Sequence, residues 1–181
     1  MTIMPQKGRI GKVYLVGAGP GDPELITLRG AKVLGEADLV LYDYLVNPAL
    51  LEHAPSAAEC ACLGHHAHGR TITQDEVHRR MIAAARAGKT VVRLKGGDPT
   101  IFGRLGEEIE ALAEASVSYE VVPGVTTATA ASALTGIALT HRDEASAVAF
   151  VTGRQRDAET KAPLDFNALA KFPGTLVFYM G

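Results

Sequence analysis

Tryptophan is missing from this 181-residue sequence, cysteine occurs only twice, and neither sign of charge is in large excess. The 18 Lys and Arg residues against 20 Asp and Glu residues give a formal net charge of -2. This charge argues against nucleic acid or an anionic membrane surface as the main partner. No apolar run approaches the ~18 residues that a membrane-spanning helix needs. The first eleven residues also lack a long apolar segment, so we expect no secretory signal.

The two cysteines, Cys60 and Cys62, lie too close together in the sequence to form a useful structural disulfide, which favours a reducing cytoplasm as the location. His65, His66 and His68 follow them, and Cys and His are the usual ligands of zinc. The spacing lacks a C-x-x-C unit, and both cysteines fall on an expected strand, so we expect no metal site. The histidines are alternatively cations or proton donors beside an acidic ligand.

Apolar residues make up 47% of the sequence and charged residues 21%, a mixture typical of a globular protein. The length suits one domain, or one domain plus part of another. Short apolar segments rich in β-branched residues alternate with segments of helical spacing. Such alternation predicts an α/β fold with a parallel sheet and right-handed crossovers. Strands are expected over residues 11–17, 38–42, 59–63, 91–94 and 119–122, and helices over 26–37, 48–53, 74–87 and 105–115.

A second unit is expected after Pro123-Gly124, where the alternation breaks. A helix of small residues is predicted over 125–134, and strands over 147–152 and 175–179. The chain stops directly after the last of these strands, so we expect the second α/β domain to be truncated. The predicted organisation is an N-terminal α/β domain over residues 11–122, and a linker helix with a partial C-terminal α/β domain over residues 123–181.

The expected strand at 91–94 stops abruptly at Gly96-Gly97-Asp98-Pro99. Adjacent glycines remove every Cβ from the strand end, so a flat ligand can approach the main chain closely. Asp98 adds an acceptor for paired hydroxyls or an ammonium group, and Pro99 turns the chain away. An ordinary strand-to-loop turn is the alternative interpretation.

Three further strand ends carry residues of the same kind: Gly17–Asp22, Asp43 and Pro123–Thr127. Ligands of open α/β sheets bind beyond the carboxyl ends of the strands, so the four segments together predict a binding cleft. The glycine spacing after Gly17 and the neighbouring prolines disfavour a nicotinamide or flavin site. Asp43 is a candidate base or substrate-orienting group, or alternatively a helix N-cap or a loop salt bridge. Thr126 and Thr127 either cap a helix or bind a ligand.

Six segments, residues 16–23, 37–46, 91–104, 121–126, 139–142 and 177–181, occur in a fixed order along the chain. In that order they resemble the motifs of the tetrapyrrole methylase family, and the resemblance covers residues 11 to 181. It implies a fold of two α/β domains with S-adenosylmethionine held between them and no metal. It also implies a homodimer that acts on a small-molecule tetrapyrrole.

The resemblance also assigns roles to single residues. Asp43 falls on the proposed proton acceptor, and His65 stands where a catalytic lysine is expected. Contacts to S-adenosylmethionine are implied for Pro20, Gly96, Gly97, Asp98, Ile101, Thr126, Thr127 and Met180. The chain departs from the family pattern where Tyr44 and His66 replace arginines, Leu134 replaces a tyrosine and Thr127 replaces an alanine.

The implied activity is the transfer of methyl groups from S-adenosylmethionine to two ring carbons of uroporphyrinogen III. The product is precorrin-2, a precursor of sirohaem and cobalamin. The lost Arg and Lys side chains weaken the expected recognition of a substrate with eight carboxylates. Two alternatives therefore stay open: methylation of a later corrin intermediate, or a degenerate module that binds cofactor or tetrapyrrole without turnover.

Overall fold

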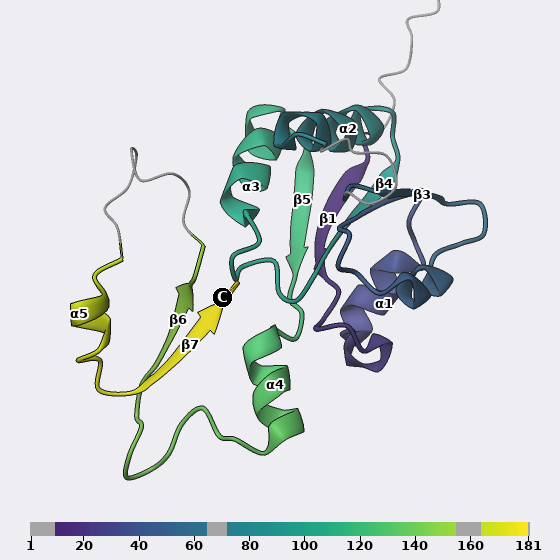
Figure 1. The fold of residues 1–181 in the computed structure, drawn as a ribbon. Helices are drawn as coiled ribbons and strands as arrows, with labels where there is room; N and C mark the ends of the chain where they lie inside the picture. The colour runs from purple at the N-terminus through teal and green to yellow at the C-terminus, as the bar shows by residue number, and fades with distance from the viewer. Residues whose placement is uncertain (1–9, 65–71, 155–163, 181) are drawn as a thin grey trace, which may run out of the picture. The chain divides into compact units, whose positions relative to one another are not determined.

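The computed structural model describes residues 10–64, 72–154 and 164–180. Two compact units divide the chain between Thr127 and Ala128. The first unit contains a five-stranded sheet in which every pair of neighbouring strands is parallel, which confirms the predicted α/β class (Figure 1). In the order β3-β2-β4-β1-β5, the strands are β1 (Lys12–Gly17), β2 (Leu39–Tyr42), β3 (Glu59–Cys62), β4 (Thr90–Lys95) and β5 (Ser118–Val122).

Three α-helices of this unit are α1 (Leu28–Leu34), α2 (Gln74–Arg86) and α3 (Leu105–Glu114). The first two begin at threonine N-caps, Thr27 and Thr73, whose hydroxyls accept the backbone N–H three residues on. The expected helix over 26–37 is therefore shorter than predicted, because Ile26 and the capping Thr27 are extended.

The described residues of this unit also include two 3-10 helices, η1 (Pro23–Leu25) and η2 (Pro48–His53). The segment 48–53 was expected to be a helix, and Asn47 caps it by accepting the N–H of Ala49 at 3.0 Å. The 3-10 turn at η1 was not expected from the sequence. Asp22 caps that turn through Glu24, with a proline in its first turn.

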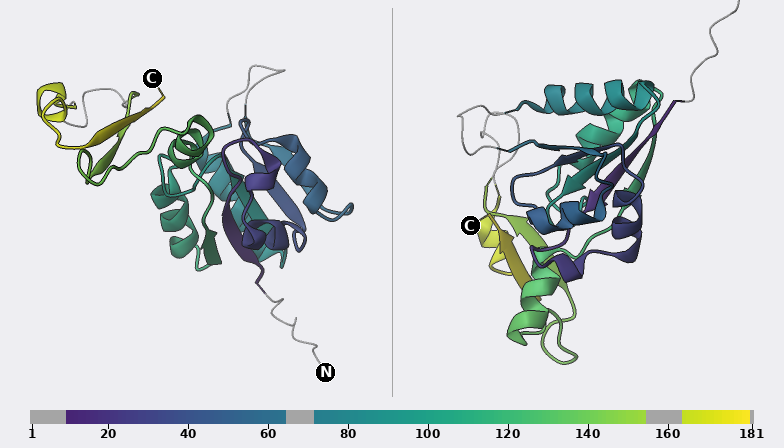
Figure 2. Two further views of the ribbon diagram at one scale, coloured as in Figure 1. Left: turned by 90° about the horizontal axis from the view of Figure 1, so that it is seen from below. Right: turned by 90° about the vertical axis from the view of Figure 1, so that its right-hand side faces the viewer.

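Hydrophobic residues fill both faces of the sheet, as the side-chain alternation of β1 requires. Val13 and Leu15 pack with residues of α2 and α3 on one face, while Val16 packs with Val33 and Leu34 of α1 on the other. The views in Figure 2 show these helices on the two sides of the sheet. The first unit is thus a three-layer α/β/α arrangement.

Helix α4 (Thr127–Thr135) begins at the last residue of the first unit and lies otherwise in the second, which also holds β6 (Val148–Thr152), the short α5 (Phe166–Leu169) and β7 (Thr175–Tyr179). Strands β6 and β7 form a parallel pair, as expected for a second α/β unit. The short helix α5 was not predicted, and the Asp165 carboxylate caps it through the N–H of Ala168. The domain boundary that we place after residue 122 stays a prediction. Within the described residues, no helix is long and apolar enough to cross a membrane.

Candidate functional site

Three strand ends meet backbone to backbone at the carboxyl edge of the five-stranded sheet. They are Gly17 at the end of β1, Gly97 after β4 and Gly124 after β5. A Cβ on Gly124 would lie 2.2 Å from the carbonyl oxygen of Gly97, and a Cβ on Gly17 would lie 2.6 Å from the Gly124 Cα. Only glycine permits this approach, so the local sequence dictates a site lined by main chain.

The loops after β1 and β4 are fixed to each other by paired backbone hydrogen bonds. The Gly97 N–H donates to the Gly19 carbonyl at 2.7 Å, and the Gly19 N–H donates to the Gly97 carbonyl at 3.1 Å. Both glycines have positive φ, +80° at Gly19 and +65° at Gly97. A Cβ built on Gly97 would meet only the Thr126 Cα, at 4.0 Å. The space beside this peptide is therefore open to a flat ligand.

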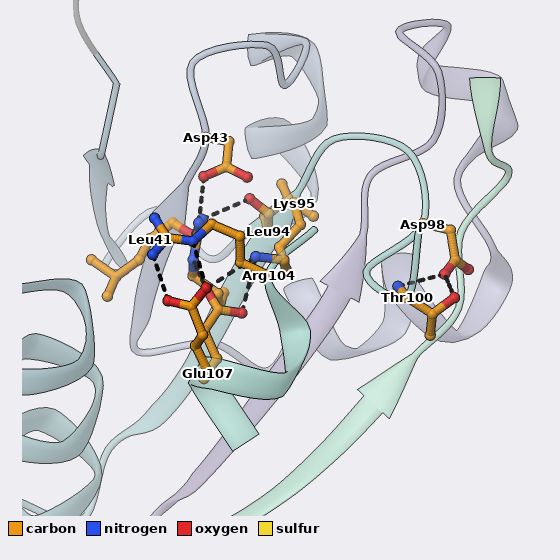
Figure 3. A network of polar contacts seen from close by, with 10 residues as sticks. Leu41, Asp43, Leu94, Lys95, Asp98, Thr100, Arg104 and Glu107 are labelled. Carbon is orange, nitrogen blue, oxygen red and sulfur yellow. Dashed lines mark hydrogen bonds and ion pairs between the residues drawn. The ribbon is translucent and has the colours of Figure 1, made fainter. Parts of the chain in front are cut away.

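The Asp98 carboxylate forms hydrogen bonds to the backbone at the same edge of the sheet. Its Oδ2 accepts the Gly124 N–H at 2.9 Å, and its Oδ1 accepts the Thr100 N–H at 2.8 Å and the Thr100 hydroxyl (Figure 3). The carboxylate thus joins the end of β4 to the end of β5. Because a carboxylate offers about four acceptor positions, it can accept further hydrogen bonds from a ligand.

The other residues predicted to contact a cofactor belong to both units. Pro20 lies in the loop after β1, Ile101 donates its N–H to the Asp98 carbonyl at 3.2 Å, and Thr126 precedes α4. Exposed Thr127 is the first residue of α4, and half-exposed Met180 follows β7 in the second unit. Met180 has a φ of +57°, a conformation that it shares with Phe102, Arg104 and Ser116 among the described non-glycine residues.

Asp43 directly follows β2, and its backbone is fixed at both ends. Its N–H donates to the Leu94 carbonyl at 3.1 Å, and its carbonyl accepts the Val46 N–H at 3.0 Å. The carboxylate is 37% exposed and forms an ion pair with Arg93, whose side chain is 3% exposed. A salt bridge, one of the alternatives that the sequence left open for Asp43, is therefore present, and the Asp43 carboxylate stays partly exposed to solvent.

Behind Asp43, Arg93 and Lys95 of β4 point toward α3, on the face of the sheet that is otherwise apolar. Both cations contact Glu108, which is fully buried: Arg93 Nε lies 3.0 Å from Oε1, and Lys95 Nζ lies 2.9 Å from Oε2. Burial and the neighbouring Arg93 lower the pKa of Lys95 below its ordinary value of 10.5, although Glu108 opposes this shift. Figure 3 shows Asp43 and Lys95 in this network.

His65, His66 and His68 lie outside the described residues. Gly64, which precedes them, packs tightly on Tyr44, the residue after Asp43: a Cβ on Gly64 would lie 2.9 Å from the Tyr44 Cα. Cys60 and Cys62 are exposed free cysteines on β3, and burial still raises the pKa of the Cys60 thiol. Within residues 10–64, 72–154 and 164–180, no three Cys, His, Asp or Glu side chains are grouped to hold a metal ion.

Sequence reasoning missed three buried charges and one loop contact. Arg93 and Lys95 occupy a strand that was interpreted as apolar, and Glu108 occupies the apolar face of α3. Charges inside a strand otherwise typical of a buried sheet were the available signal. Asn47 was also missed; its side chain donates to the Gly21 carbonyl at 2.8 Å and so joins the loops after β1 and β2.

A parallel sheet with glycine backbone and an ion-paired carboxylate at its carboxyl edge defines a class: α/β proteins that bind a ligand at their strand ends. The family model for Tetrapyrrole (Corrin/Porphyrin) Methylases matches residues 12–181. The S-adenosyl-L-methionine-dependent uroporphyrinogen III methyltransferase of Methanosarcina barkeri is 47% identical, and the match covers 96% of this chain and 68% of that protein. This chain therefore belongs to the tetrapyrrole methylase family.

Two further relatives show how much of each protein is shared. Siroheme synthase of Zymomonas mobilis is 52% identical over 94% of this chain, which spans only 36% of that longer protein. The crystal structure of uroporphyrin-III C-methyl transferase from Thermus thermophilus, complexed with S-adenyl homocysteine, superposes with a TM-score of 0.75. It is 46% identical, and the match covers 94% of this chain and 66% of that structure.

Proposed function

We propose that this chain is the S-adenosylmethionine-binding and catalytic part of a uroporphyrinogen-III C-methyltransferase, which forms precorrin-2 for sirohaem and cobalamin synthesis. The carrying observation is the carboxyl edge of the sheet, where the Gly97 backbone lies open next to the Asp98 carboxylate. Two of the relatives add support: the name of the Methanosarcina barkeri protein states this substrate and this methyl donor, and the Thermus thermophilus uroporphyrin-III C-methyl transferase is complexed with S-adenyl homocysteine.

The residues present fit the methyl donor. Open main chain at Gly97 suits a flat purine or ribose ring, and Asp98 suits ribose hydroxyls or an ammonium group. We propose Pro20, Gly96, Gly97, Asp98, Ile101, Thr126, Thr127 and Met180 as its contacts. When bound, S-adenosylmethionine supplies an electrophilic methyl group on a sulfonium, and its alignment with the substrate carbon is an orientation effect.

Asp43 is proposed as the proton acceptor. Each transfer adds one methyl group to a ring carbon, and one proton leaves the substrate for each methyl gained. A half-exposed carboxylate at the sheet edge, held by a buried arginine, is suited to accept that proton. His65, which lies outside the described residues, is proposed as the proton donor because it stands where the family pattern has a catalytic lysine and because histidine can donate a proton.

The test is incubation of the chain with S-adenosylmethionine and uroporphyrinogen III, followed by mass analysis of the product. A gain of two methyl groups is the expected result. Binding of S-adenosylhomocysteine in a calorimeter, with no methylated product from any tetrapyrrole, would instead favour the non-catalytic module. Product formed only from a corrin substrate would favour the later-intermediate alternative.

Two substitutions test the proposed roles. Asp43→Asn should lower kcat by roughly 10²–10⁴-fold, the usual contribution of a general base, while the Kd for S-adenosylhomocysteine stays unchanged. His65→Lys restores the residue expected from the family pattern and should raise turnover. A kcat that is unchanged or lower in His65→Lys would contradict the role proposed for that position.

We also propose that the protein forms a homodimer in the cytoplasm, with no nucleic-acid or membrane partner. The two free cysteines support a reducing location, and the family resemblance supports the dimer. Sedimentation equilibrium at several protein concentrations tests the dimer, and a monomeric mass throughout would contradict it.

A further inference from the structure

Glu108 is the most deeply placed charge near the candidate site. Its side chain is fully buried on α3 between Arg93 and Lys95, whose own side chains are 3% and 4% exposed. Taking charges out of water costs several kcal/mol per ion even after the protein relaxes, and pairing repays this cost only where the geometry is good, so a hydrophobic core alone gives no reason to bury three of them. Their contacts instead lead from Glu108 on α3, through Arg93, to Asp43 at the carboxyl edge of the sheet.

Arg93 connects Glu108 to that edge. Its Nε donates to Glu108 Oε1 at 3.0 Å, and its Nη2, a second nitrogen of the same planar guanidinium, donates to Asp43 Oδ1. The remaining nitrogen, Nη1, donates to the backbone carbonyls of Leu94 at 3.3 Å and Leu41 at 3.5 Å. Because each of the three guanidinium nitrogens donates a hydrogen bond, the planar guanidinium is held in one orientation.

The charges in this group also balance. Arg93 and Lys95 supply two cations, and Glu108 and Asp43 supply two carboxylates. Of the four, only Asp43 is substantially exposed, at 37% of its side chain. Loss of the Glu108 charge would leave two buried cations facing Asp43 alone, and the carboxylate would be drawn inward toward them.

We propose that Glu108 is a positioning residue for Asp43: it fixes the Arg93 guanidinium so that the Asp43 carboxylate is held at the carboxyl edge of the sheet. This inference rests on the proposed function of Asp43 as proton acceptor. Glu108 itself is buried behind Arg93, so it acts through the arginine and not on the substrate.

A double-mutant cycle separates this role from simple core packing. Glu108→Gln keeps the size of the side chain and places an amide between two cations. We expect it to lower kcat about tenfold or more, with KM and the Kd for S-adenosylhomocysteine within twofold of wild type. In an Asp43→Asn background the same change should cost less than twofold, because the group that Glu108 positions has already been neutralised. Glu110→Gln, an exposed carboxylate on the same helix, is the matched control and should leave kcat unchanged.

Independent, multiplicative losses from Glu108→Gln and Asp43→Asn would overturn the proposal, as would a rise in KM and Kd with unchanged kcat. If Glu108→Gln does not fold, Arg93→Lys runs the same cycle, since lysine keeps the charge but cannot contact Glu108 and Asp43 together. Failure of the proposed function has a different signature: wild-type chain that makes no methylated product, or Asp43→Asn with wild-type kcat.

Discussion

At the scale of single residues, Asp98 combines a structural role with a proposed role in ligand binding. We expect Asp98→Asn to lower the free energy of unfolding by about 1–3 kcal/mol, because the amide group would face either the Gly124 N–H or the Thr100 donors. Urea unfolding measures this change, and calorimetry should show weaker binding of S-adenosylhomocysteine. Thr100→Val removes only the hydroxyl donor and serves as the control with a smaller effect. Equal stability of Asp98→Asn and wild type would contradict the role in joining β4 and β5.

Gly124 is a second residue whose identity is set by close contact. We expect Gly124→Ala to destabilise the fold by about 1–3 kcal/mol, since its Cβ would lie 2.2 Å from the Gly97 carbonyl oxygen and force the strand ends apart. The matched control is Gly106→Ala in α3, where a Cβ would meet nothing within 4 Å. That change should stabilise by about 0.5–1 kcal/mol through the better helix propensity of alanine. Thermal unfolding should show a lower Tm for Gly124→Ala and a higher Tm for Gly106→Ala than for wild type.

At the scale of elements, one carboxylate joins three of them. Glu120 of β5 contacts Lys12 of β1 at 2.7 Å and Arg29 of α1 at 2.7 Å, and both cations lie over the Tyr14 ring. These hydrogen bonds lower the pKa of Glu120 below its ordinary 4.5, and its pairing raises the pKa values of Lys12 and Arg29. The contacts lie on the surface, so their contribution is screened by salt.

A pH dependence follows from the direction of the Glu120 shift. Because its pKa is lower in the folded state, the pair contributes stability above pH 4.5, and this contribution is lost as the pH falls through the folded-state value. We expect Glu120→Gln to be less stable than wild type at pH 7 and equally stable at strongly acidic pH. Urea unfolding across this range measures the difference, and a gap that persists unchanged at low pH would contradict the assignment.

At the scale of the whole molecule, the two units differ in how much structure protects their strands. Strands β1 and β4 lie inside a five-stranded sheet with apolar residues on both faces, whereas β6 and β7 form a two-stranded pair in which Phe150 and Phe178 are exposed. Two-stranded sheets are marginal in water, so opening of the second unit should need less free energy. We expect its strand amides to exchange hydrogen at least roughly a hundredfold faster than those of β1 and β4. Equal protection in native-state exchange would contradict this.

The sequence by itself determined the order of elements and the main-chain character of the site. All seven strands found in the described residues lie within a residue or two of their expected positions, because side-chain period and the Gly, Pro or Asp residues that follow the strands are local properties. Glycine and aspartate after β4 predicted a ligand site for the same reason. Helix ends were less well predicted, since the caps Thr27, Asp22 and Asp165 depend on side-chain hydrogen bonds of particular geometry.

Only the tertiary structure decided which charges face one another. Asp43 and Arg93 are 50 residues apart, and they meet because β4 inserts between β2 and β1. The same insertion turns Arg93 and Lys95 toward Glu108 on α3, in a face that the pattern had assigned to apolar residues. Strand order is fixed by burial over the whole sheet, which no local pattern encodes. The sequence therefore predicted which strand ends carry exposed main chain for a proposed ligand site, and the fold decided how the proposed proton acceptor is held.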